Sequence, residues 1–188
     1  MTRIILRALN GPLLILLITL GIALQSSLFS SWPFLYLQPD IVLLAVIWCS
    51  LRRGFKEGGV ITLILANICE IHSAAPQGLY LTSYMALYLL VRGSSRLLMV
   101  PSLMHYGMLT IASSIAWKLI GLLILYLLGG SANQWRHTLA FLLLGAAVEG
   151  VFSIWIYKWF EKFDWLTFKH FKVERAMDEE LDLDHEGF

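Results

Sequence analysis

The sequence has little charge. Lysine, arginine, aspartate and glutamate together make up only 14% of its 188 residues, whereas an ordinary soluble domain has roughly 25%. This scarcity argues against a soluble helical bundle, because such a fold needs charged outward faces. The net charge of +1 implies no bulk attraction to nucleic acid. Hydrophobic side chains reach 58% instead, which indicates a membrane protein.

Cysteines and catalytic motifs are also scarce. Cys49 and Cys69 lie near the ends of two successive apolar runs that cross in opposite senses, so their depths differ by most of a bilayer. A disulfide needs alpha-carbons within about 7 Å, and we therefore predict free thiols. The chain contains no H-E-x-x-H, G-x-S-x-G, C-x-x-C or phosphate-cradling glycine loop. We expect no catalytic, cofactor-binding or metal site.

Six apolar runs are long enough to be membrane helices, since crossing ~30 Å of hydrocarbon takes about 20 residues. Segments rich in glycine, proline and serine separate them. The expected spans are approximately 9–28, 35–51, 58–75, 79–100, 103–128 and 137–159. The sequence therefore predicts an all-α integral membrane protein with six transmembrane helices.

The basic residues predict the orientation, because lysine and arginine are retained on the cytoplasmic side of short loops. All of them except Lys118 and Arg136 fall before the first span or at the ends of the second, fourth and sixth spans and beyond them. Both termini are therefore expected in the cytoplasm. Aromatic residues favour the two interfaces. We expect Trp32, Tyr36, Tyr80 and Trp135 at the outer one and Trp48, Trp155, Tyr157 and Trp159 at the inner one.

The chain changes character after the sixth span. We place a transmembrane domain at residues 1–160 and a cytoplasmic tail at residues 161–188. Aromatic residues and lysines alternate in the first part of the tail, which suits an amphipathic helix lying on the membrane surface. The alternative is a simple extension of the sixth helix. The final run, "DEELDLDHE", is acidic and expected to be disordered.

Four ionisable residues of the spans need an explanation, because a charge at the bilayer centre costs ~3 kcal/mol and usually finds a partner. Asp40 follows Pro39 and is expected to cap the second helix, with Pro39 at a helix-start position. Glu70 and Lys118 fall at similar depth and are candidates for an ion pair. Glu149, about one turn deeper, is the competing partner for Lys118.

Glu70 is the least expected of these residues. It lies in "NICEIHSAAPQGLY", near the end of a helix, where the dipole disfavours a carboxylate. We expect it to be ionised only where Lys118 or donors of the following loop reach it. Gly78 would permit the turn into the fourth span, and Pro76 would keep the third helix from continuing.

Small residues allow helices to approach closely in two places, "ASSIA" at 112–116 and "GAAVEG" at 145–150. Packing inside the bundle and association with a partner's membrane helix are both consistent with these segments.

Residues 34–93 resemble the bacterial rod shape-determining protein MreD. The similarity lies in "LQPDIVLLAVIWCSLRRG" and "GGVITLILANICEIHSAAPQGLYLTSYMALYLLVRG". The shared features are a proline and an acid entering the second span, an aromatic near its inner end, an acid ending the third span and a later glycine. They read here as Pro39, Asp40, Trp48, Glu70 and Gly78. Ala66 replaces a common glycine, Glu70 replaces the usual aspartate, and the acidic tail is longer than is typical.

The resemblance implies a non-catalytic scaffold of the elongasome in the bacterial inner membrane. Such a protein binds the membrane helix of MreC and helps position MreB, RodA and a penicillin-binding transpeptidase, so that lateral peptidoglycan synthesis maintains rod shape. It also implies a fold similar to the S component of energy-coupling-factor transporters. Lipid would be the other partner, and no nucleic acid is expected.

Two other functions differ in class. An S component would bind a vitamin and dock through an A-x-x-x-A pair on its first helix, but the first span here contains no such pair. A membrane enzyme could use Glu70 or Glu149 as a general base, but neither has a nucleophile or metal partner at a suitable spacing.

Overall fold

The structure is a computed structural model that describes residues 2–28, 39–73, 75–95, 103–129 and 132–167. All the regular secondary structure of these residues is helical, as the sequence predicts. The helices are α1 (Thr2–Leu28), α2 (Ile41–Arg52), α3 (Phe55–His72), α4 (Leu79–Ser95), α5 (Leu103–Leu127) and α6 (Ala132–Leu166).

Three of the described helices are long and apolar enough to cross a membrane, namely Leu9–Ser27 in α1, Met104–Leu127 in α5 and Leu142–Leu166 in α6. This agrees with the predicted membrane character. The 12 residues of α2 extend only about 18 Å at 1.5 Å per residue, less than the ~30 Å of hydrocarbon. Six complete crossings therefore remain a prediction.

The second span was expected to begin at residue 35, but α2 begins at Ile41. Residues 35–38 lie outside the described part of the chain. Pro39 is not the first helical residue, because Asp40 occupies the N-cap position directly after it. The proline therefore precedes the cap, and its carbonyl accepts a hydrogen bond from the Gln25 side chain of α1.

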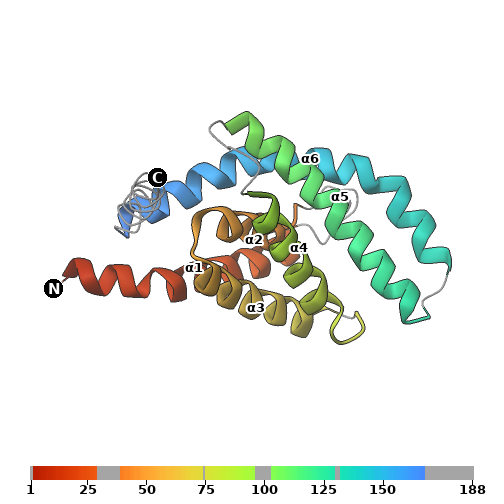
Figure 1. Ribbon diagram of the computed structural model, residues 1–188, viewed down its shortest axis with the longest axis horizontal. Helices are drawn as coiled ribbons and strands as arrows, with labels where there is room; N and C mark the ends of the chain where they lie inside the picture. The colour runs from red at the N-terminus through yellow and green to blue at the C-terminus, as the bar shows by residue number, and fades with distance from the viewer. Residues whose placement is uncertain (1, 29–38, 74, 96–102, 130–131, 168–188) are drawn as a thin grey trace, which may run out of the picture.

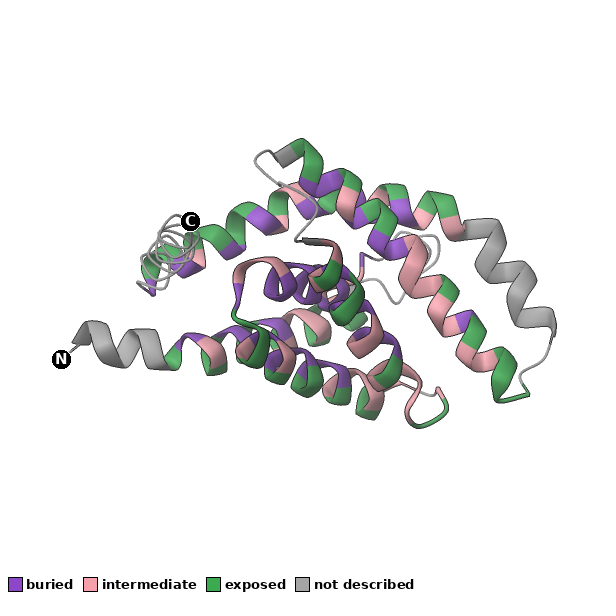
Figure 2. Ribbon diagram, in the orientation of Figure 1, coloured by how far each residue is buried: buried purple, intermediate pink, exposed green. Residues whose placement is uncertain are grey.

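α2 is the centre of the bundle. It packs against each of the other helices, and every residue from Val42 to Ser50 is buried. An apolar run of this length is typical of a helix inside a protein core rather than of one facing lipid. Figure 1 shows α2 and α4 in the middle, with α1 and α3 below them and the α5–α6 pair above, and Figure 2 shows the burial of α2.

Gly58 allows α2, α3 and α4 to approach closely. A β-carbon at this position would lie 2.8 Å from the hydroxyl oxygen of Tyr88 on α4 and 2.9 Å from the carbonyl oxygen of Cys49 on α2. The Tyr88 hydroxyl in turn donates to the carbonyl of Phe55, 2.7 Å away, at the start of α3. Gly58 is therefore required for the contact of these three helices.

Trp48 and Tyr157 are both buried, so their rings face the inside of the bundle and not lipid. Their depth at the inner interface remains a prediction. Their ring centroids are 4.8 Å apart in an edge-on arrangement between α2 and α6. Tyr80 is half-buried and stacks on Tyr84. Only Trp155 and Trp159 point outward among the aromatic residues expected at the inner interface. Trp32, Tyr36 and the side chain of Trp135 lie outside the described residues.

The expected boundary at residue 160 falls inside a continuous helix, since α6 extends to Leu166. The predicted acidic end of the tail lies outside the described residues. The prediction that Cys49 and Cys69 form no disulfide is confirmed; Cys49 is buried and Cys69 partly buried.

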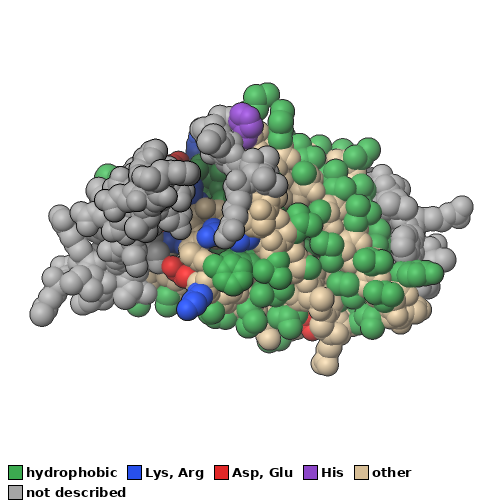
Figure 3. Space-filling model, in the orientation of Figure 1, with side chains coloured by type: hydrophobic (Ala, Val, Ile, Leu, Met, Phe, Trp, Pro, Cys, Tyr) green, Lys and Arg blue, Asp and Glu red, His purple; other side chains and the backbone are tan. Residues whose placement is uncertain are grey.

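Basic side chains gather at one end of the bundle. We call this end, which carries Arg52, Arg53, Arg92, Lys158 and Lys162, the basic end. Figure 3 shows charged side chains toward the left of one face and mostly hydrophobic ones over the rest of it. This segregation is expected of a bundle with one end at a membrane surface.

Reporter fusions in cells test the topology. Fusions after residues 30, 76 and 132 are expected to read as periplasmic and those after 55, 95 and 175 as cytoplasmic, because the basic loops alternate along the chain. Reversed readings at two or more of these sites would contradict the six-span arrangement.

Candidate functional site

Glu70 caps the helix that follows its own. Its carboxylate accepts hydrogen bonds from the backbone N–H of Gly78 and, at 3.1 Å, from that of Leu81. These amides lie at the start of α4, where the positive end of the helix dipole favours an anion. Glu70 is therefore held by donors of the loop and the next helix, and not by Lys118. The predicted turn also occurs at Gly78, whose φ is +89°.

Asp40 caps α2 in the way expected from the sequence. Its Oδ1 accepts from the backbone N–H of Leu43 at 3.0 Å. Its Oδ2 accepts from the hydroxyl of Tyr84 on α4 at 2.6 Å. The second bond was not predicted, and it joins the start of α2 to the middle of α4.

The opposite end of α2 is also joined to α4. Nη1 of Arg92 donates to the backbone carbonyls of Ser50 at 2.8 Å and Arg53 at 3.0 Å. The last carbonyls of a helix have no partner within the helix, and a cation is favoured there. Tyr84 and Arg92 thus attach α4 to both ends of α2.

Lys118 pairs with Glu149, the competing partner considered above. Its Nζ lies 3.3 Å from Glu149 Oε1 and 3.3 Å from Ser114 Oγ. Gly145 makes room for this arrangement, because a β-carbon there would lie 2.8 Å from the Lys118 nitrogen. The predicted Glu70–Lys118 pair does not form, because Glu70 is held at α4 instead.

The two small-residue segments pack partly inside the bundle, although Ala112 and Ala147 are exposed. α5 and α6 pack extensively along each other. A β-carbon on Gly150 of α6 would lie 2.5 Å from the side chain of Ile111 on α5. A β-carbon on Gly107 of α5 would lie 3.6 Å from the carbonyl oxygen of Gly150. These glycines are therefore used between α5 and α6 and not by a partner helix.

A buried polar cluster at the basic end was missed by the sequence reasoning. Arg53, whose side chain is only 1% exposed, forms an ion pair with Asp164 of α6. Asn10 of α1 donates to the same carboxylate at 3.1 Å and to the Thr167 hydroxyl at 2.5 Å. The cluster joins α1, the end of α2 and α6. A polar Asn10 within an apolar run was the signal in the sequence.

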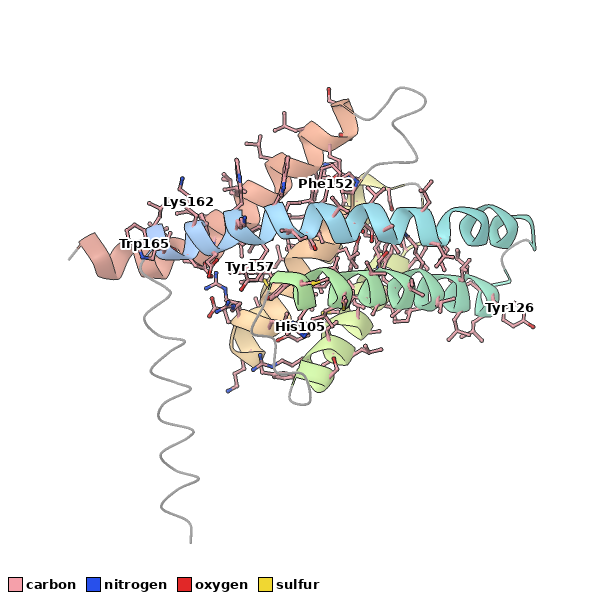
Figure 4. The ribbon with its side chains drawn as sticks, turned by 90° about the horizontal axis from the view of Figure 1, so that it is seen from above. His105, Tyr126, Phe152, Tyr157, Lys162 and Trp165 are labelled. Atoms are coloured by element: carbon pink, nitrogen blue, oxygen red, sulfur yellow. The ribbon has the colours of Figure 1, made fainter. Side chains whose placement is uncertain are left out.

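An apolar groove separates α1 from α6 beyond this cluster. It has a volume of about 670 Å³, and an adjoining hollow of about 380 Å³ continues it toward Gln25 and Pro39. In Figure 4 the two helices cross near Trp165 and diverge away from it. Phe152 and Lys162 lie on the side of α6 that faces α1, whereas Tyr157 lies on the other side.

Among the described residues, no three histidine, cysteine, aspartate or glutamate side chains lie close enough together to hold a metal ion. No protein-family model matches the sequence, and no curated protein or solved structure matches it either.

Replacing Lys118 by methionine tests the ion pair. The change should lower the free energy of unfolding by about 3 kcal/mol, because it leaves Glu149 buried without its cation. The double variant with Glu149→Gln should lose about 1–3 kcal/mol less stability than the sum of the two single losses. Unfolding of the purified protein in detergent provides the measurement.

The matched control is Lys118→Met combined with Glu70→Gln, since Glu70 is bound elsewhere. Their effects should add within about 0.5 kcal/mol. Additive effects in the Glu149 combination, or coupling in the Glu70 one, would refute the assignment.

Proposed function

We propose that this chain is a non-catalytic membrane scaffold of the MreD kind, which supports lateral peptidoglycan synthesis in the elongasome of a rod-shaped bacterium. It would lie in the inner membrane with both termini in the cytoplasm. The resemblance over residues 34–93 is the starting point of this proposal.

One observation carries the proposal further. The polar residues of the resemblance all form contacts between helices: Asp40 binds Tyr84 of α4, and Glu70 binds the start of α4. Trp48 packs between α2 and α6. These contacts fasten the central helices to one another, which suits a protein that positions others.

The proposed direct partner is the membrane helix of MreC, and MreB, RodA and the transpeptidase would be reached through it. The exposed row Leu143, Ala147 and Val151 on α6 is a suitable contact face. A small residue between two large ones lets a second helix approach closely. Gly145 and Gly150 lie against side chains of α5, whereas Ala147 is exposed.

Co-purification tests the proposal. The full chain, extracted from membranes in mild detergent, is expected to retain full-length MreC and no unrelated single-span protein. Ala147→Trp should reduce the retained MreC several-fold by blocking close approach, whereas Leu123→Trp on the exposed face of α5 should not. Retention of a vitamin without MreC would replace the proposal by the S-component function.

A further inference from the structure

The groove between α1 and α6 has bulky walls. Its lining from α1 and α6 consists largely of Leu17, Ile18, Leu20, Trp159, Phe160 and Phe163, with Ile41 of α2 at its base. Trp159 is 74% exposed, so the groove opens sideways to the surroundings of the protein. Its volume is within the 300–1,000 Å³ typical of sites for small ligands.

The walls favour flexible chains over a helix. Helices that pack closely in a membrane meet at small residues. In the described part of the chain, Gly21 is the one small residue that lines this groove. A rigid helix, about 10 Å across, would rest on the projecting leucine and aromatic side chains. Acyl chains can fill the irregular spaces between them.

Among the described residues that line the groove, Lys162 is the one that carries a charge. Lys162 is exposed and lies on the groove side of α6 (Figure 4). It is two residues from Asp164, which binds Arg53 and Asn10 at the basic end. A lysine at the end of an apolar groove complements an anionic headgroup whose chains lie in that groove.

We propose that the groove binds one anionic phospholipid, with its acyl chains between α1 and α6 and its phosphate beside Lys162. The polar cluster holds α1 and α6 together at the end where the headgroup lies. At the other end, the Gln25 side chain bonds to the Pro39 carbonyl and keeps α1 beside the start of α2. This site does not depend on the proposed role in cell shape.

Native mass spectrometry of the purified full chain tests the site. Phosphatidylglycerol and phosphatidylcholine with identical acyl chains are titrated separately. We expect one molecule of phosphatidylglycerol to bind per chain, more tightly than phosphatidylcholine does. Lys162→Gln should weaken its binding about fivefold, the effect of one lysine near an anionic lipid. Lys158→Gln is the matched control, because this exposed lysine on the same helix does not line the groove.

A second pair of variants tests the groove itself. A β-carbon at Gly21 would lie 3.4 Å from the side chain of Ile41. Gly21→Leu should therefore fill this part of the groove and weaken the binding of both lipids. Ala23→Leu, on an exposed position of α1, should weaken neither. Equal affinity of the wild type for the two lipids, or equal effects of Lys158→Gln and Lys162→Gln, would overturn the proposal. So would a photo-crosslinker at Leu17 that captures a protein helix in cells instead of lipid.

Discussion

The burial of α2 sets the main constraint on this fold. A helix surrounded by apolar side chains leaves polar backbone groups at each end, and each buried group without a partner costs about 1–3 kcal/mol. Asp40 satisfies an amide at the start, and Arg92 satisfies carbonyls at the end. Because Tyr84 holds Asp40 and also belongs to α4, both ends of α2 are fixed to one helix.

Glu70 extends this arrangement to α3. It belongs to α3 but binds the start of α4. α4 holds both ends of α2, and α3 in turn holds α4. Gly58 brings the three helices into direct contact through Tyr88. α1 and α6 pack around this unit and leave between them the groove to which we assign a lipid. The proposed functions thus use surfaces outside a centre in which Asp40, Glu70 and Arg92 are already engaged.

The features of the fold that could be predicted are those that depend on residues close together in the sequence. The helical class followed from hydrophobic run length, and the role of Asp40 followed from its place before an apolar run. The Asn10–Asp164 contact joins residues far apart in the chain, and neither charge of the Arg53–Asp164 pair had been placed within a span. The burial of Trp48 could not be predicted, because an aromatic residue near the end of a span suits both an interface and a core, and only tertiary packing distinguishes them.

Comparing Glu70→Gln with Glu70→Leu tests most directly whether the Glu70 carboxylate serves architecture. Glutamine retains an acceptor for the start of α4, so folded protein in the membrane and rod shape should both persist. Leucine removes the acceptor from the amides of Gly78 and Leu81, at about 1–3 kcal/mol for each donor, and folded protein should be lost. Abundant Glu70→Gln protein that no longer supports rod shape would contradict the account and show that the charge itself is functional.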